Sequence, residues 1–449
     1  MIIYIGGRWK MKKVVKFGGS SLASAEQFKK VGDIIRKDPS RRYVVPSAPG
    51  KRFSDDTKVT DMLYSCYAAA VKEKKFTELL DKIKERYQEI IDGLGLDFSL
   101  DEDFDIIRVN FSKKIGRDYA ASRGEYLNGK VMAAYLGFEF VDAAEVIRFN
   151  EDGTFNDALT NELLSGRLAD MENAVIPGFY GAKEDGTVVT FSRGGSDVSG
   201  SLVALAVNAD LYENWTDVSG FLIADPRIVK KPKSIETITY KELRELSYMG
   251  ASVLHEDAIF PVRKAGIPIN IKNTNAPQDK GTLIVEGTCR QSKYTITGIA
   301  GTDGFVAITI EKAMMNSEIG FCRKVLQVFE ENNVSIEHMP SGIDTMTIFV
   351  HKDVFEEKEQ KILAEIHKAV NPDHIELESD LALIAIVGRG MKSTRGTAGR
   401  IFSALAHAHI NVKMIDQGSS ELNIIVGVRH DDFKNAIRAL YEIFVVTQI

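Results

Sequence analysis

Cysteine is scarce in this chain, with only Cys66, Cys289 and Cys322 among 449 residues. None belongs to a CxxC pair and their number is odd, so a disulfide framework is excluded and a reducing, cytoplasmic location is expected. A catalytic thiol stays open as an alternative use of one cysteine. The eight histidines include no HExxH motif, which argues against a structural zinc site.

Long hydrophobic runs and an excess of basic charge are also missing. No apolar stretch approaches the ~18 residues that a membrane-spanning helix needs, so no membrane partner is expected. The 57 Lys and Arg residues are outnumbered by 63 Asp and Glu residues, for a net charge of −6. This balance argues against a nucleic-acid partner, which usually requires a basic face, but it leaves small anionic ligands open.

The rest of the composition is that of an ordinary folded protein. Hydrophobic residues make up 44% and charged residues 27%, which is enough for a sizeable core. A chain of 449 residues suggests about three domains. The first ten residues are too short and wrongly charged for a signal peptide, and a strongly patterned run begins at Met11. We interpret residues 1–10 as an extension outside the fold, either an upstream start or an expression remnant.

Strand and helix patterns alternate through the first two thirds of the chain. Apolar residues at helical spacing follow the first strand and begin near Phe28. Further helices are expected at residues 58–94, 124–136, 159–171 and 198–207. Short apolar runs predict strands at residues 12–17, 44–46, 139–141, 174–176, 188–191, 211–215, 268–272 and 282–285. This alternation predicts an α/β layer fold with a mainly parallel sheet.

Two similar units follow residue 291. Each has a strand, an amphipathic helix, a second strand and a closing helix, and Val334 matches Ile410 at an offset of 76 residues. The strands are expected at residues 306–310, 345–350, 383–387 and 422–428, and the closing helices at 355–370 and 433–444. We predict four parts: an extension at 1–10, a catalytic domain at 11–290, and modules at 291–372 and 373–449.

The first candidate site follows the first strand. Lys16 is near the strand end, and Gly18 and Gly19 allow backbone N–H groups to approach an anion closely. The GxxxxGK[ST] pattern of a Walker A loop is absent. The alternative is an ordinary turn with a solvated lysine.

The second candidate site is the run Arg193-Gly194-Gly195-Ser196-Asp197, which also joins a strand to a helix. The planar fork of Arg193 suits a carboxylate or a phosphate. Capping of the helix by Ser196 or Asp197 is the alternative, although it leaves Arg-Gly-Gly unexplained. Both turns are expected at the carboxyl edge of one sheet, where open α/β sheets bind ligands.

Three further residues have functional and ordinary interpretations. Asp217 ends a strand and can meet a nucleotide, and Arg227 can reach phosphates from the Asp-Pro-Arg loop. A plain turn is the alternative for that loop. Glu125 can bind a substrate ammonium or be a surface carboxylate favoured by a helix N-terminus.

These residues occur in a set of motifs that resembles the aspartokinases of the amino-acid-kinase family. The motifs are VVKFGGSS at 14–21, SRGE at 122–125, FSRGGSD at 191–197, WTDVSGFLIADPR at 215–227 and GASVLH at 250–255, followed by two ACT-like units. The resemblance covers almost the whole chain from Met11 onward. It implies an amino-acid-kinase-like three-layer sandwich followed by two α+β, ferredoxin-like ACT modules. Acetylglutamate, carbamate and uridylate kinases lack this tandem tail.

The resemblance also implies roles for individual residues. Lys16 and Asp197 would be catalytic, with Gly18 and Gly19 beside the transferring phosphate. The residues holding aspartate would be Ser47, Thr60, Glu125, Arg193, Gly194, Gly195 and Ser196. The remaining nucleotide contacts would be Thr216, Asp217, Leu222, Arg227, Ser252 and Val253. Many relatives have Lys in place of Ser252 and Tyr in place of Leu222, which sets this chain apart in the nucleotide region.

The implied reaction is transfer of a phosphoryl group from ATP to the β-carboxylate of L-aspartate, with Mg²⁺ as cofactor and no dedicated protein metal site. A β-carboxylate is already ionised at neutral pH, because its ordinary pKa is about 3.9, so no general base is needed. Charge neutralisation and alignment then remain as the enzyme's task. A non-catalytic amino-acid sensor on a degenerate kinase scaffold is the alternative. A fused homoserine dehydrogenase is not expected, because the second unit runs to Ile449.

The tandem tail implies regulation. Modules of this kind usually pair between subunits and bind an amino acid where they pair, so we expect a homodimer, with a tetramer open. Lysine is the leading effector by resemblance and threonine the second. The expected effector contacts are Met315, Asn316, Ser317, Phe321 and Glu337. Core packing is the alternative for Met315 and Phe321, and solvation is the alternative for Glu337.

Overall fold

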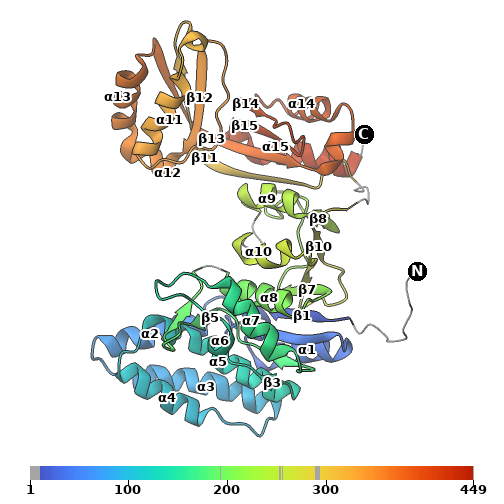
Figure 1. The fold of residues 1–449 in the computed structure, drawn as a ribbon. Helices are drawn as coiled ribbons and strands as arrows, with labels where there is room; N and C mark the ends of the chain where they lie inside the picture. The colour runs from blue at the N-terminus through green and yellow to red at the C-terminus, as the bar shows by residue number, and fades with distance from the viewer. Residues whose placement is uncertain (1–10, 193, 252–253, 255, 289–293, 448–449) are drawn as a thin grey trace, which may run out of the picture. The chain divides into compact units, whose positions relative to one another are not determined.

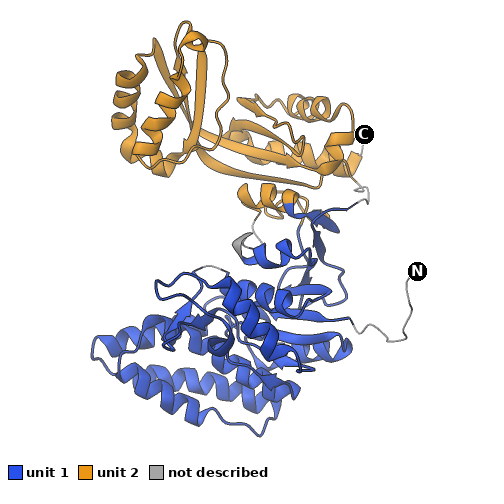
Figure 2. Ribbon diagram, in the orientation of Figure 1, with its two compact units in different colours: residues 1–221, 236–240, 253–288 blue, residues 222–235, 241–252, 289–449 orange. Residues whose placement is uncertain are grey.

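A computed structural model describes residues 11–447 except 193, 252–253, 255 and 289–293 (Figure 1). The chain forms two compact units, and each is built from separate stretches of sequence (Figure 2). The first unit comprises residues up to 221 together with 236–240 and 253–288, and the second comprises 222–235, 241–252 and 289–449. None of the described helices is both long and apolar enough to cross a membrane.

The first unit is built around an eight-stranded sheet in the order β3-β4-β2-β1-β7-β9-β10-β8. All its strand pairs are parallel except β9 with β10, which confirms the predicted, mainly parallel sheet. The strands are β1 (Lys13–Phe17), β2 (Arg41–Pro46), β3 (Glu139–Phe140), β4 (Ala174–Val175), β7 (Leu211–Thr216), β8 (Thr237–Thr239), β9 (Ile269–Asn273) and β10 (Thr282–Val285). A separate hairpin joins β5 (Tyr180–Ala182) to β6 (Val188–Thr190).

Helices cover both faces of this sheet. Val15 and Phe17 of β1 face a core built largely from α1 (Ala25–Lys37), α2 (Val59–Val71), α3 (Thr77–Leu94), α4 (Asp101–Ser112) and α5 (Arg117–Leu136). Lys16 alternates to the opposite face, where α8 (Gly195–Ala206) contacts β1, β2 and β7. The other helices of this unit are α6 (Ala143–Val146), α7 (Asp157–Leu168) and α10 (Glu256–Lys264), whereas α9 (Tyr240–Tyr248) belongs mostly to the second unit.

Two helix predictions need correction. The helical pattern at residues 58–94 forms α2 and α3 rather than one helix, and the break contains Glu73 with a positive φ of 56°. Residues 72–75 of this break are all charged and supply no apolar face that would hold a continuous helix to the core. The helix predicted at 124–136 begins earlier, at Arg117.

The second unit contains a five-stranded sheet in the order β12-β11-β13-β15-β14. Its strands are β11 (Gly298–Glu311), β12 (Thr345–His351), β13 (His374–Val387), β14 (Met414–Asp416) and β15 (Asn423–Arg429). Its helices are α11 (Phe321–Glu331), α12 (Lys352–Phe355), α13 (Glu359–Val370), α14 (Thr397–His407) and α15 (Phe433–Tyr441). Figure 1 shows α11 and α13 near one end of the long strands and α14 and α15 near the other.

Each long strand takes part in both modules. The second half of β11 pairs with the first half of β13, and the first half of β11 pairs with the second half of β13. One module core lies under α11 and α13 and contains Val306, Ile308 and Ile310 of β11. The boundary predicted at residue 372 falls between these two strands, which pair with each other along their length, and the four-part division of the chain stays a prediction.

Candidate active site

The two glycine-containing turns meet through an ion pair. The Nζ atom of Lys16 lies 2.7 Å from Oδ1 of Asp197, and the same oxygen accepts a 2.7 Å hydrogen bond from the Asn214 amide. Lys16 is 8% exposed. Asp197 lies in the first turn of α8, where the helix dipole favours a negative charge. The ends of β1, β7 and α8 thus assemble one charged cluster.

The first turn is packed so closely that it requires glycine. The Gly18 N–H donates to the carbonyl of Trp215 at 3.0 Å, which joins the ends of β1 and β7. A Cβ atom on Gly19 would lie only 2.8 Å from the carbonyl oxygen of Ala48. The loop after β2 therefore lies directly against this turn, and three strand ends contribute to one edge of the sheet.

The second turn has similar constraints. Gly194 adopts a left-handed φ of 57° just before α8, a conformation that favours glycine. A Cβ atom on Gly195 would lie 2.5 Å from the Phe179 ring, and one on Gly178 would lie 2.7 Å from the Cβ of Ser196. The segment after β4 thus fixes the start of α8. Arg193 lies outside the described residues.

Glu125 is a buried acid near the same cluster. It is 6% exposed, and among the described residues its Oε2 atom has no hydrogen-bond partner. Burial raises the pKa of Glu125 to about 8, although the backbone N–H of Ala48 and the charge of Lys16 act in the opposite direction. The residue is a carboxyl group with an unsatisfied oxygen, which suits a cationic ligand.

Close packing of the backbone places Ser47 and Thr60 near Glu125. The Ser47 N–H donates to the carbonyl of Phe17 at 3.0 Å, at the end of β1. A Cβ atom on Gly124 would lie 3.7 Å from Oγ1 of Thr60, so α2 and α5 approach each other beside Glu125. The Tyr87 hydroxyl donates to the carbonyl of Gly124 at 2.7 Å.

Two asparagines complete the cluster, and neither was predicted from the sequence. Asn214 interrupts the apolar pattern of β7 and donates to Asp197, while Asn128 donates to the Ser47 carbonyl at 2.6 Å. A polar residue within a buried strand was the available signal for Asn214. For Asn128 the signal was its position three residues after Glu125, on the same helix face.

The predicted nucleotide contacts are divided between the two units. Thr216 ends β7, and its hydroxyl donates to Asp217 at 3.1 Å. Leu222 and Arg227 belong to the second unit. The Arg227 guanidinium is 87% exposed and lies 2.6 Å from the carboxylate of Asp225. Ser252 and Val253 lie outside the described residues.

The residues present fit a magnesium ion that arrives with a nucleotide. No group of three His, Cys, Asp or Glu side chains able to hold a metal occurs in the described part of the chain. Lys16 and Asn214, described above, both contact the Oδ1 atom of Asp197. Magnesium is commonly held by one or two carboxylates together with substrate phosphates, and Asp197 can supply such a carboxylate.

The predicted effector contacts fall into two groups in the second unit. Met315 and Phe321 are buried in the module core, whereas Asn316 and Ser317 are not part of it. Glu337 accepts a hydrogen bond from the Tyr248 hydroxyl and lies 3.7 Å from Nε2 of His351. Burial and the bond to Glu337 raise the pKa of Tyr248 to about 12.

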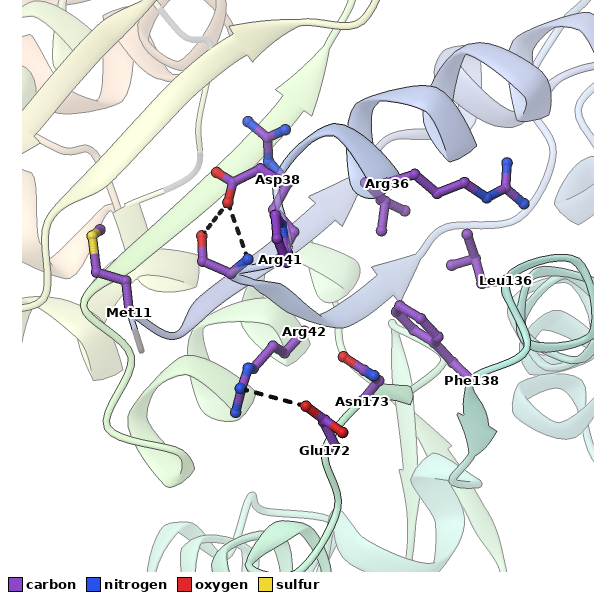
Figure 3. A pocket seen from close by; sticks show the side chains of 12 residues that line it. Met11, Arg36, Asp38, Arg41, Arg42, Leu136, Phe138, Glu172 and Asn173 are labelled. Atoms are coloured by element: carbon purple, nitrogen blue, oxygen red, sulfur yellow. Dashed lines mark hydrogen bonds and ion pairs between the residues drawn. The ribbon is translucent and has the colours of Figure 1, made fainter. Parts of the chain in front are cut away.

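A cavity of about 520 Å³ lies elsewhere in the first unit, at the amino ends of β1, β2 and β4 (Figure 3). Its arginines already have partners: Arg41 donates to Glu213 at 2.8 Å, Arg36 donates to the Tyr135 carbonyl at 2.9 Å, and Arg42 faces Glu172. Ligands of open α/β sheets bind at the carboxyl ends of the strands. This cavity is therefore not our candidate active site.

Residues 11–273 match the amino acid kinase family, and residues 384–444 match an ACT domain. The chain is 41% identical to Aspartokinase 3 of Bacillus subtilis over 448 residues, or 96% of this chain and 98% of that protein. The crystal structure of aspartate kinase from Clostridium acetobutylicum, described as an allosteric enzyme, is 52% identical with a TM-score of 0.89, covering 96% and 99% of the two chains.

A more distant structure shares the fold. Escherichia coli aspartokinase III is 24% identical with a TM-score of 0.71, and the match covers 96% of this chain and 99% of that one. That protein was solved with aspartate and ADP and also with lysine and aspartate.

Proposed function

The chain belongs to the aspartokinases of the amino acid kinase family, and on this premise we propose how its residues carry out the reaction. The enzyme transfers the γ-phosphoryl group of ATP to the β-carboxylate of L-aspartate, giving 4-phospho-L-aspartate and ADP. This reaction is the first step toward lysine, threonine and methionine. The alternative of a non-catalytic sensor is not supported, since the relatives that match along the chain are kinases.

The observation that carries the catalytic proposal is the Lys16–Asp197 ion pair beside the Gly18–Gly19 turn. A β-carboxylate oxygen forms a new bond to the γ-phosphorus, while the bond from that phosphorus to the β,γ-bridging oxygen breaks and leaves ADP. The Lys16 ammonium neutralises charge on the transferring group, and the glycines admit it close to backbone N–H groups. Asp197, fixed by Asn214, orients Lys16.

Aspartate would bind beside this pair. Glu125 has a buried oxygen with no described partner, and the ammonium of aspartate would supply one. Arg193 would hold the α-carboxylate through its planar fork. Ser47, Thr60 and the backbone of Gly194, Gly195 and Ser196 would surround the rest of the substrate. The complex of E. coli aspartokinase III with aspartate and ADP supports this choice of ligands.

The nucleotide would lie at the end of β7, against Thr216 and Asp217, with Leu222, Arg227, Ser252 and Val253 as further contacts. Asp197 would help hold Mg²⁺, which would offset the negative charge of the phosphates when bound. The substitution of Ser252 for the lysine of many relatives removes one positive charge there. Arg227 is the remaining cation that we assign to the phosphates.

The reaction is tested by trapping the acyl phosphate with hydroxylamine, which converts it to a hydroxamate. With MgATP, L-aspartate should give product and L-glutamate should give little, because its longer side chain displaces the carboxylate from the phosphorus. Absence of aspartate-dependent product would refute the proposal. Replacement Arg193→Ala should raise the KM for aspartate at least about tenfold, and an unchanged KM would remove that role.

Regulation involves the ACT region. We propose that an end-product amino acid, lysine before threonine, binds the first module at Asn316, Ser317 and Glu337, with Met315 and Phe321 supporting the site from the core. The Glu337 carboxylate suits a lysine ammonium, and a lysine complex is known for E. coli aspartokinase III. Titrating lysine and threonine against the initial rate should give inhibition by lysine. A flat response to both would make the tail structural.

The modules would also join two copies of the chain in the cytoplasm. Exposed apolar side chains in the first module include Met314, Ile319 and Ile343, and a contiguous exposed apolar patch is typical of a contact between proteins. We propose a homodimer through this surface, with a tetramer as the larger possibility. Analytical ultracentrifugation with the charged variant Ile319→Glu should give a monomer, while an unchanged dimer would place the interface elsewhere.

A further inference from the structure

The loop after β2 interlocks with the glycine turn after β1. The Gly50 N–H donates to the Gly19 carbonyl at 2.8 Å. A Cβ atom on Gly50 would lie 2.6 Å from the carbonyl carbon of Gly19. Neither backbone can move toward the other, so the position of the Gly50 loop sets the position of the Gly19 turn.

One buried side chain anchors the loop at residues 47–58, between β2 and α2, which contains Gly50 and is called the Gly50 loop here. Arg86 of α3 is 4% exposed. Its Nη1 donates to the Thr57 carbonyl at 2.6 Å, its Nη2 donates to the Gly50 carbonyl, and the same Nη2 lies 3.2 Å from Asp56. The guanidinium thus joins the early part of the loop to its end, just before α2.

This arrangement is energetically demanding for an ordinary loop anchor. Burial lowers the pKa of Arg86, and its Nε atom has no hydrogen-bond partner within the described chain. A buried cation costs free energy unless its donors are satisfied. A neutral side chain could tie two carbonyls together, whereas the rigid guanidinium fork fixes the distance between them.

We propose that Arg86 is a positioning residue for the phosphate end of the active site. It holds Gly50 against Gly19 and thereby sets the backbone N–H groups that receive the nucleotide phosphates beside Lys16. The inference rests on the proposed function, because it assigns a phosphate role to the Gly18–Gly19 turn. Arg86 itself touches neither substrate.

A purely structural role makes a different prediction. If Arg86 only stabilised the fold, its loss would lower the melting temperature and the fraction of active enzyme, but the molecules that remain folded would keep the normal KM for ATP. A positioning role changes the KM for ATP in the folded enzyme. The KM for ATP, measured separately from kcat and from the KM for aspartate, distinguishes the two roles.

The experiment compares Arg86→Ala and Arg86→Lys with Arg52→Ala. Arg52 donates to the same Asp56 carboxylate at 2.9 Å but does not reach Gly50 in the described contacts, so it is a matched control. Arg86→Ala should lower kcat/KM for ATP by about 10²-fold, and millimolar guanidinium should restore part of the loss. Arg86→Lys should be only partly active, and Arg52→Ala should stay within about twofold of the wild type.

A second variant keeps the test decisive if Arg86→Ala does not fold. Gly50→Ala leaves Arg86 in place but separates the two loops, and it should raise the KM for ATP in the same way. A normal KM for ATP in both Gly50→Ala and Arg86→Lys would overturn the proposal. ADP affinity by calorimetry is measured on every variant. If the wild type shows no aspartate-dependent turnover, the proposed function fails, while the ADP affinities still test Arg86.

Discussion

Lys16 and Asp197 form a 2.7 Å ion pair although they come from the first strand and the eighth helix of the fold. Asn214 donates to the same Asp197 oxygen, so the carboxylate cannot turn away without losing two contacts. This geometry links the two glycine-containing turns and places one positive charge at the carboxyl edge of the sheet. Catalysis requires this relationship between the two residues.

Replacement of Asp197 by Asn should lower kcat about 10²- to 10³-fold, because loss of a preorganised charge contact in an active site costs roughly 3–4 kcal/mol of transition-state stabilisation. The fold should persist, since an amide fills the same space. Asp210→Asn is the control, because Asp210 accepts a hydrogen bond from the Lys12 backbone at the opposite end of β1. Hydroxamate assays of both variants check the prediction, and equal rates would contradict it.

The KM for aspartate should fall as the pH rises from about 6.5 to 8.5. The pKa of Glu125 is raised to about 8 in the free enzyme, so below this pH the carboxyl is largely protonated and must lose its proton to pair with the substrate ammonium. The limiting change is about tenfold per pH unit. Glu125→Gln should have a high KM with little pH dependence. A flat profile for the wild type would contradict the assignment.

The same residue should affect stability in the absence of substrate. The pKa of Glu125 in the folded protein, about 8, lies above the ordinary glutamate pKa of 4.5. Its favourable contribution to the free energy of unfolding is therefore complete below pH 4.5 and is lost as the pH rises through 8. Glu125→Gln should therefore be more stable than the wild type at pH 8.5, with little difference at pH 4.5. Urea unfolding measures this, with exposed Glu162→Gln as the control. A destabilised Gln variant at pH 8.5 would contradict the sign.

Tyr248→Phe should increase sensitivity to lysine. The Tyr248 hydroxyl donates a hydrogen bond to the Glu337 carboxylate, which we propose as an effector contact. Removal of the hydroxyl leaves that carboxylate available to bind lysine. A lost hydrogen bond to a charged group is worth about 1.5–3 kcal/mol, and partial competition should lower the inhibitory lysine concentration several-fold. Tyr240→Phe is the control, because its hydroxyl donates to Ile267 instead. Unchanged inhibition by lysine would separate Tyr248 from the effector site.

Local patterns predicted much of this structure. The apolar run of β1 and the helical spacing of α1 and α8 depend on neighbouring residues, and so do the two glycine turns. The mainly parallel sheet followed from their alternation. The proximity of Lys16 to Asp197 could be expected because carboxyl ends of parallel strands share one edge.

The features that depend on distant contacts could not be predicted in this way. Asn128 resembles an ordinary helical residue until the loop after β2 brings the Ser47 carbonyl to it. Arg86 resembles any other charged residue of an amphipathic helix, and its burial depends on how α3 packs. The pairing of β11 with β13 across the two modules depends on strand register over fourteen residues in each strand. The periodicity of the sequence does not specify that register.

The most direct test of the central claim is a parallel assay of the wild type, Lys16→Met and Lys12→Met with MgATP, L-aspartate and hydroxylamine. The wild type and Lys12→Met should form aspartyl hydroxamate at similar rates. Lys16→Met should lose at least about 10³-fold in kcat while retaining the wild-type circular dichroism spectrum. Hydroxamate formation by folded Lys16→Met at the wild-type rate would contradict the account.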